Sequence, residues 1–371
     1  MKFRCERDSL AEALAVAGRA ATGRTSTHPV LSGLRLELSG DHLTVTGTDL
    51  ELTIQLDLAV GGELDGSAVI PAKLASDIVR ALPNGAVEVS IDDDDVKIAA
   101  GRSKFSVRLM SVDDYPRIAE PASSAVTINA AAFGEALRQV VRAASTDEQR
   151  QVLTGVLLTA EKDGLRLVAT DSYRLAVRDL PGVSVLGADQ KVLVPAKALN
   201  ELQRMLGFGD DLVLRLGERE VTFEIGSARV TTRLIEGSFP DYARLIPPSH
   251  PNVVTIAREQ LLEAIKRMKI LARDTTSATS VLRLNITADS VELKTISQDL
   301  GKATEELDAS NSGSDLEVAF NPEYLSSGVE AVGTDEVTIS TENAVKPAIV
   351  RGVGNDDFLY LLMPVKVQTG G

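Results

Sequence analysis

Pairs of basic side chains recur at helical spacing in this sequence. Lys73 and Arg80 lie seven residues apart, and Lys197 and Arg204 repeat the same pair 124 residues later. Seven residues make about two turns of an α-helix, so each pair lies on one helix face. Such a face can hold nucleic-acid phosphates, or it can simply be solvated. The repetition at one offset favours the binding interpretation.

Carboxylates also recur, at Asp49 and Asp171, each directly after a Thr. They could be imagined as the acids of a phosphotransferase, but recurrence suits a structural turn better than one active centre. The sequence has no GxxxxGKS/T loop, HExxH helix, dinucleotide turn or Ser-His-Asp arrangement, which are the usual signs of catalysis. We therefore expect no enzyme activity, no catalytic residue and no cofactor.

Metal and disulfide chemistry is also not expected. Cys5 is the only cysteine, and His28, His42 and His250 are scattered singly, whereas a zinc site needs clustered ligands. We expect Cys5 to be a small hydrophobe in the first strand. The run from Asp92 to Asp95 lacks the spacing and the Gly of a calcium loop, so it is interpreted as a solvated turn.

Composition indicates a folded protein of two or three domains. The chain has 371 residues, 44% of them hydrophobic, and a net charge of −14, which argues at first against binding to phosphates. Basic residues, however, gather in predicted helices and acidic residues in predicted turns. No apolar run approaches the roughly 18 residues of a membrane span and no secretory segment is visible, so we expect a cytoplasmic protein.

A threefold repeat organises the chain. Similar strand-helix segments begin at Met1, Val126 and Val254, with apolar residues at i and i+4, the pattern of a helix with one buried stripe. Strands with alternating apolar residues follow each helix. A second helix, opened by a proline, begins near Ile70, Val194 and Phe320. Each unit therefore predicts two helices packed on antiparallel sheet, an α+β fold.

Proline-rich seams separate the three units, and we place the domains at 1–122, 123–248 and 249–371. If neighbouring units extend one another's sheets, three of them leave two sheet edges unpaired, and unpaired edges promote aggregation. A head-to-tail homodimer would pair both edges and close a ring of six domains. We expect the helices inside this ring and the sheets outside.

Four motifs resemble a known family, the beta subunit of bacterial DNA polymerase III. They are TGTDLE from Thr46, ATDSYRLAV from Ala169, EGSFPDYARLIP from Glu236 and LLMPVKV from Leu361. The resemblance covers essentially the whole chain. It implies a sliding clamp, a non-catalytic ring that encircles duplex DNA without reading its sequence and gives processive replication. It also implies that polymerase III alpha subunit, the clamp loader, other polymerases and repair proteins bind through short linear peptides.

The resemblance also assigns site residues by matching positions. The peptide-binding cleft between the second and third domains is assigned to Leu153, Thr170, Ser172, Tyr173, Arg174, Leu175, Pro240, Arg244, Leu245, Asn321, Tyr324, Val345, Leu361, Leu362, Met363 and Pro364. The DNA-facing residues are Arg24, Lys73, Arg150, Gln151 and Lys197. At the dimer seam, Arg102 and Lys104 are expected to face Glu305 and Glu306 of the partner chain. Tyr173 departs from the His of many relatives. A scaffold that binds proteins but not DNA remains the alternative.

Overall fold

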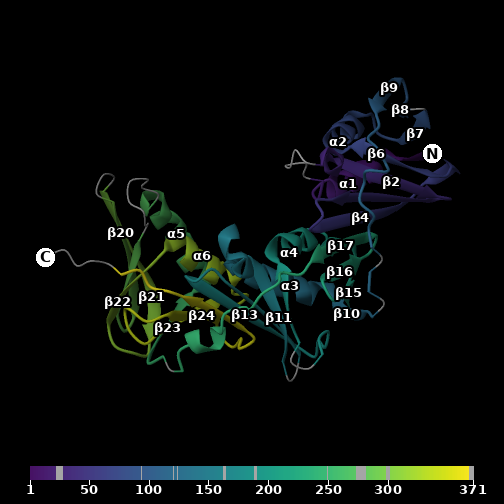
Figure 1. Ribbon diagram of the computed structural model, residues 1–371. Helices are drawn as coiled ribbons and strands as arrows, with labels where there is room; N and C mark the ends of the chain where they lie inside the picture. The colour runs from purple at the N-terminus through teal and green to yellow at the C-terminus, as the bar shows by residue number, and fades with distance from the viewer. Residues whose placement is uncertain are drawn as a thin grey trace. The chain divides into compact units, whose positions relative to one another are not determined.

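The computed structural model describes residues 1–371 except 22–27, 93, 120, 123, 162–163, 188–189, 249, 273–280, 298–300 and 367–371. It divides into two compact units (Figure 1). The first comprises 1–134 and 197–234, and the second comprises 135–196 and 235–371. Each unit thus contains part of the predicted central domain. The boundaries at residues 122 and 248 stay a prediction.

The first unit begins with the expected strand-helix segment. It contains α1 (Arg7–Ala17), α2 (Ala72–Ala81), the start of α3 (Ala130–Val140), α4 (Ala196–Gln203) from its second residue on, and the short 3-10 helices η1 (Pro29–Ser32) and η4 (Leu206–Phe208). Helix α1 buries Leu10, Ala13 and Leu14, the one-sided stripe that the sequence predicts. This stripe packs α1 against α2 and onto the strands β3 and β4.

Two antiparallel sheets complete the first unit. Their strands are β1 (Lys2–Glu6), β2 (Gly33–Ser39), β3 (His42–Thr48), β4 (Leu52–Ala59), β5 (Gly61–Leu64), β6 (Gly66–Pro71), β7 (Ala86–Asp92), β8 (Asp95–Ala100), β9 (Ser103–Arg108), β10 (Val126–Asn129), β15 (Asp211–Leu216), β16 (Glu220–Ile225) and β17 (Ala228–Arg233). Pairing of β17 with β4, with Val230 opposite Ile54, joins the strands of the first and central repeats. The predicted extension of one repeat's sheet by the next is confirmed here.

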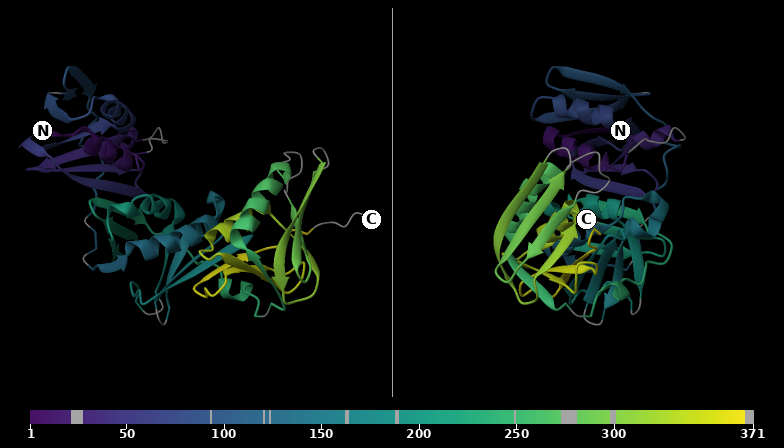
Figure 2. Two further views of the ribbon diagram at one scale, coloured as in Figure 1. Left: turned by 180° about the vertical axis from the view of Figure 1, so that it is seen from behind. Right: turned by 90° about the vertical axis from the view of Figure 1, so that its left-hand side faces the viewer.

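The second unit has the same construction. Its helices are the rest of α3, α5 (Arg258–Ala272), α6 (Pro322–Ala331) and the 3-10 helices η2 (Val141–Ala143), η3 (Glu148–Leu153) and η5 (Tyr242–Leu245). Its strands are β11 (Gly155–Glu161), β12 (Gly164–Thr170), β13 (Arg174–Pro181), β14 (Lys191–Pro195), β18 (Asn252–Ala257), β19 (Leu282–Ile286), β20 (Ser290–Ser297), β21 (Gly301–Asn311), β22 (Leu316–Phe320), β23 (Glu336–Thr341), β24 (Ala348–Gly352) and β25 (Phe358–Leu362). Figure 2 shows α5 lying along the hairpin of β20 and β21.

A second strand pairing joins the central and third repeats. Strand β13 pairs with β25, with Val177 opposite Leu359, inside one twelve-stranded antiparallel sheet. The α+β fold of repeated units is therefore confirmed. One detail differs from expectation: Pro71 and Pro195 end the preceding strands, and only Pro322 is the first residue of its helix. Proline fixes φ without donating a hydrogen bond, which suits both positions.

Cys5 lies in the first strand, as predicted, and its side chain is buried. Burial raises the pKa of the Cys5 thiol to about 11, because a thiolate is poorly solvated there. The residue therefore packs as a small neutral hydrophobe.

Candidate binding cavity

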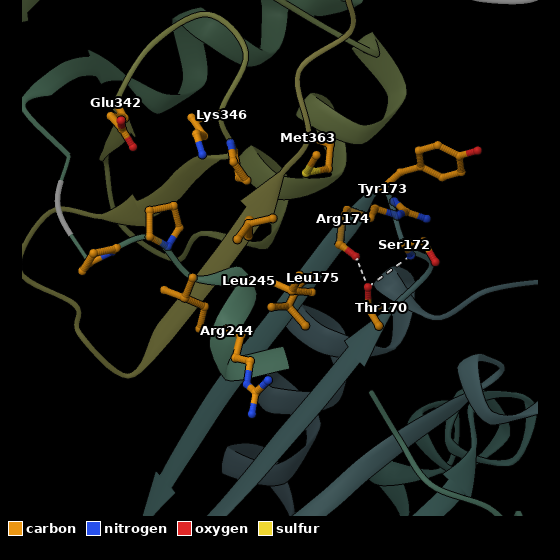
Figure 3. Close-up of a pocket in the computed structure, with 15 residues that line it drawn as sticks. Thr170, Ser172, Tyr173, Arg174, Leu175, Arg244, Leu245, Glu342, Lys346 and Met363 are labelled. Carbon is orange, nitrogen blue, oxygen red and sulfur yellow. Dashed lines mark hydrogen bonds between the residues drawn. The ribbon is translucent and has the colours of Figure 1, made fainter. Parts of the chain in front are cut away.

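The second unit contains a cavity of about 430 Å³ where β13 meets β25 (Figure 3). Four segments of the chain line it: the turn before β13 with the start of that strand, the end of η5 with the residues after it, the loop between β23 and β24, and the end of β25. The lining residues are Thr170, Ser172, Tyr173, Arg174, Leu175, Arg244, Leu245, Ile246, Pro247, Pro248, Glu342, Lys346, Pro347, Leu361 and Met363. This volume falls in the range of ligand-binding pockets.

The turn between β12 and β13 is fixed by its own side chains. Oδ1 of Asp171 accepts hydrogen bonds from the backbone N–H groups of Tyr173 (2.9 Å) and Arg174 (3.0 Å). The Thr170 hydroxyl accepts from the N–H of Ser172 and donates to the carbonyl of Arg174. Ser172 takes a φ of +82°, an uncommon conformation that the surrounding hydrogen bonds hold. The T-D dipeptide therefore shapes one wall of the cavity.

The first repeat forms the same turn between β3 and β4. Oδ1 of Asp49 accepts from the N–H groups of Glu51 and Leu52, and Leu50 has a φ of +77°. The Thr48 hydroxyl again accepts from the residue two positions on. Because both aspartates serve the same backbone turn, the geometry agrees with the structural interpretation of Asp49 and Asp171 rather than with a phosphotransferase site.

The stacked rings of Tyr173 and Tyr324 form one edge of the cavity, called the Tyr173 edge below, and Arg174 lies against it. Its Nε donates to Oδ2 of Asp171 at 2.9 Å, and the guanidinium carbon lies 4.5 Å from the ring centroid of Tyr324. Burial opposes the charge, but Tyr360 and Asp171 outweigh it, so the pKa of Arg174 is raised. Tyr324 in turn stacks on Tyr173, with ring centroids 6.2 Å apart. A guanidinium over an aromatic face stabilises this stack.

Tyr360 fixes Tyr324 from below. Its hydroxyl donates to the Tyr324 carbonyl at 3.0 Å, and burial raises the pKa of Tyr360 to about 12, so the phenol stays a donor at neutral pH. Gly328 in α6 permits this contact, since an added Cβ would lie 2.5 Å from the Tyr360 ring. Helix α6 and strand β25 therefore support the Tyr173 edge together.

A buried apolar cluster forms the floor of the cavity. It contains Leu157, Val168, Leu175, Val177, Leu193, Ile349, Leu359 and Leu361. The EGSFPDYARLIP motif packs on it through Phe239, Tyr242 and Ile246, so the motif is structural as well as cavity-forming. Above this floor, Tyr173, Leu245 and Met363 remain 58%, 48% and 39% exposed. Exposed apolar side chains over a rigid floor suit an extended peptide with apolar anchors.

Nine of the predicted cleft residues line the cavity, and the others lie around it. Thr170, Ser172, Tyr173, Arg174, Leu175, Arg244, Leu245, Leu361 and Met363 belong to the lining. Leu153 and Leu362 are buried, and Val345 is 60% exposed. Tyr324 supports the edge, Pro240 is exposed, and Pro364 is half-buried. For these residues outside the described lining, direct contact with a peptide stays a prediction.

Asn321 caps a helix, and this gives a testable prediction. Its Oδ1 accepts from the N–H groups of Glu323 (2.9 Å) and Tyr324 (3.3 Å) at the start of α6. We expect Asn321→Ala to lower the free energy of unfolding by about 1 kcal/mol, the usual value of such a cap. Asn321→Asp keeps the acceptor and serves as the control in denaturant titrations. Equal losses in both variants would contradict the capping role.

Six lining residues escaped the sequence prediction: Ile246, Pro247, Pro248, Glu342, Lys346 and Pro347. The Pro-rich seam was interpreted only as a linker, although its position directly after Arg244 and Leu245 was a usable signal. No sequence pattern marks Glu342 or Lys346. They reach the cavity because β23 and β24 bring their connecting loop beside β25.

The residues assigned to DNA have different surroundings. Lys73 is exposed on α2, and Arg24 lies outside the described residues. Lys197 donates from Nζ to Oδ2 of Asp49 at 2.7 Å. Arg150 donates to Asp147 and to the Ser172 hydroxyl, and Gln151 beside it is exposed. That these residues face DNA stays a prediction.

The residues assigned to the dimer seam lie on strands with an open edge. Lys104 is exposed on β9, and Arg102 is exposed in the preceding turn; among the described strands β9 pairs only with β8. Glu305 and Glu306 lie on β21. Hydrogen bonds from Arg267 hold the pKa of Glu305 below its ordinary value, so Glu305 already has a partner within its own chain.

Two features are absent from the described residues. No helix there is long and apolar enough to span a membrane. No group of three or more His, Cys, Asp or Glu side chains there is arranged to hold a metal ion.

Repeated two-helix units with shared antiparallel sheets, and a cavity where two repeats join, define a protein of the clamp class. Models of the DNA polymerase III beta subunit match its N-terminal domain at residues 1–119, its central domain at 127–241 and its C-terminal domain at 243–366. The beta sliding clamp of Streptomyces coelicolor is 34% identical over 99% of this chain and 100% of its own length. The chain belongs to the DNA polymerase III beta subunit family.

Other relatives agree with this assignment. The beta sliding clamp of a Synechocystis strain is 34% identical over 99% of this chain and 100% of its own. The crystal structure of the DNA polymerase sliding clamp from Bacillus subtilis has a TM-score of 0.92 at 29% identity, covering 99% of both chains. A Bartonella birtlesii sliding clamp bound to griselimycin also has a TM-score of 0.92 at 29% identity, covering 99% of this chain and 100% of that one.

Proposed function

We propose that this chain is a DNA sliding clamp, the non-catalytic processivity subunit of a bacterial replicative polymerase. The observation that carries this proposal is full-length similarity to beta sliding clamps, together with matching folds. It acts by holding a polymerase near its template rather than by chemistry. The proposal places the chain in the cytoplasm, where bacterial DNA is replicated.

Two copies of the chain close into a ring head to tail. Two unpaired strand edges support this arrangement. The outer edge of β9 has no neighbour in the described chain, and β21 pairs with β18 only through residues 309–311, which leaves the preceding stretch open on that side. Pairing β9 with β21 of a partner would satisfy both edges. Opposite charges at Lys104 and Glu306 then set the pairing direction.

The cavity is the site where clients dock. Polymerases, the clamp loader and repair proteins insert short linear peptides, with apolar anchors on Leu175, Leu245 and Met363. A flexible Met suits a site that must accept several sequences. One cavity per chain gives two per ring, so different clients can bind the same clamp.

Retention on circular DNA tests this proposal. The full chain is loaded onto nicked circular duplex by a bacterial clamp loader and polymerase, and the DNA is separated by gel filtration. We expect the chain to stay with the circle and to be lost when a restriction enzyme linearises it, because a ring slides off a free end. A scaffold that binds only proteins, which the net charge of −14 would suit, would be absent from both fractions. Equal retention on circle and linear DNA would contradict encirclement.

A further inference from the structure

The first unit has a basic groove between its two N-terminal helices. The groove measures about 470 Å³ and lies between α1 and α2. Lys73 and Arg80 line it together with Arg19, Ser32, Ser76 and Asp77, among others. Lys73 and Arg80 are both exposed. Within the described chain neither side chain forms an ion pair or a hydrogen bond, so two cations stand free on one helix face.

The equivalent pair, called the α4 pair below, is engaged in ion pairs; Lys197 lies on α4 and Arg204 directly follows its last residue, Gln203. Lys197 and Arg204 follow Lys73 and Arg80 at the same offset of 124 residues. Nζ of Lys197 lies 2.7 Å from Oδ2 of Asp49. Arg204 donates to Oε1 of Glu201 at 3.0 Å. Each cation of the α4 pair therefore has a carboxylate in direct contact.

The partner carboxylates explain the difference between the two helices. Asp49 and Glu201 are only 17% and 15% exposed, so water screens their attraction for the cations less than at the surface. The residue of α2 equivalent to Glu201 is Asp77, 124 positions earlier. Asp77 is exposed and one methylene shorter, and it makes no ion pair with Arg80. The turn carboxylate Asp49 contacts Lys197, whereas no carboxylate among the described residues pairs with Lys73.

The second unit shows the same screening on its helices. Arg142, directly after α3, lies 2.9 Å from Oε2 of Glu330. Lys269 on α5 lies 2.6 Å from Oε2 of Glu323. From the sequence alone, both basic residues would be available to bind phosphates. In the structure each forms an ion pair with a carboxylate of its own unit. The free pair on α2 stands out against this background.

We propose that the chain holds the DNA backbone mainly through Lys73 and Arg80 in the groove between α1 and α2, while the matching α4 pair is screened by Asp49 and Glu201. The proposal rests on the sliding-clamp function. Its physical basis is that phosphate binding releases counterions only where a protein cation is available to replace them. Screening the other cations weakens the hold on DNA, and a clamp must slide.

Two double variants with the same change of charge test this proposal. Lys73→Gln with Arg80→Gln removes the free pair, and Lys197→Gln with Arg204→Gln removes the screened pair. The full chain is titrated into a fluorescein-labelled duplex at several KCl concentrations, and the dissociation constants are read from anisotropy. We expect the α2 variant to lower the slope of log affinity against log salt by about 2, since each phosphate contact contributes about 0.9. We expect the α4 variant to lower it by less than half as much.

A third variant removes a carboxylate that pairs with the α4 pair. Asp49→Asn frees Lys197, and the Asn side chain keeps the acceptor that the turn uses at Leu52. Glu201 is left unaltered because it also lies 3.8 Å from Arg19, which lines the groove between α1 and α2. We expect log affinity to fall more steeply with log salt concentration, and binding at low salt to tighten several-fold. The asymmetry would be overturned by equal slopes of log affinity against log salt in the two cation variants. It would also be overturned if removing the carboxylate left that slope and the affinity unchanged.

Retention of the unaltered chain on closed circular DNA tests the clamp function separately from the asymmetry between the two cation pairs. A retained chain with equal slopes in both cation variants contradicts only the asymmetry. A chain that is lost from circles overturns the clamp function and the asymmetry with it. Thermal melting of each variant checks the fold, and we expect little change in the two cation variants because the altered cations are exposed.

Discussion

Changing Leu245 and Met363 together to Asp is expected to weaken binding of a short polymerase-derived peptide with apolar anchors, the kind of ligand proposed for this cavity, at least about 100-fold. Both side chains line the cavity and are about half exposed in the free chain. A bound ligand would cover them, and each Asp would then replace an apolar contact and lose water. Losing about 1.5 kcal/mol at each of two apolar contacts gives roughly a hundredfold. Isothermal titration calorimetry measures the dissociation constants directly.

The control for this variant is Val353→Asp. Val353 is an exposed apolar residue of the same unit, 43% accessible, and it does not line the cavity. We expect the control to bind the same peptide normally. Both proteins should melt within a degree or two of the unaltered chain, because exposed positions contribute little to folding. Normal affinity in the double variant would mean that client peptides bind somewhere other than this cavity.

The sequence predicted the repeated elements well because periodicity reports burial directly. The helices α1 and α5, which follow β1 and β18, pack on strands of their units. On α3, which follows β10, Phe133 lies beside Phe223 of β16. The T-D turns were predictable as turns, since an Asp can accept from N–H groups two and three residues on. Their left-handed residues, Leu50 and Ser172, were not, because neither side chain favours a positive φ.

The residues that line the cavity were predicted only in part, because the pairing of strands decides which side chains face it. Leu361 and Leu362 are neighbours on β25, but side chains of a strand alternate between its faces, so only Leu361 belongs to the described lining. The register of β25 against β13 decides which residue faces the cavity, and one sequence does not reveal that register. Ion pairs such as Lys197 with Asp49 join residues 148 positions apart, and sequence periodicity carries no information about them.

Replacing Arg174 by Ala is expected to destabilise the second unit by about 2 to 3 kcal/mol, slightly less than the roughly 3 to 5 kcal/mol for removing one partner of a fully buried ion pair, because both side chains keep some exposure. The side chains of Arg174 and Asp171 are only 14% and 10% exposed. The substitution leaves the Asp171 carboxylate buried without its cation and removes the contact with the Tyr324 ring. A fall in thermal midpoint of about 4 to 10 °C follows for a unit of this size, and scanning calorimetry measures it.

Arg244 provides a matched control, since it is also an arginine of the cavity paired with an Asp three residues away. Its ion pair with Asp241 spans 2.7 Å, but the two side chains are 86% and 58% exposed, and exposed pairs contribute little. We therefore expect Arg244→Ala to melt like the unaltered chain. Asp171→Asn in combination with Arg174→Ala should cost less than the sum of the single changes, because the orphaned charge is then gone. Strict additivity would mean that Arg174 supports the Tyr173 edge by packing alone.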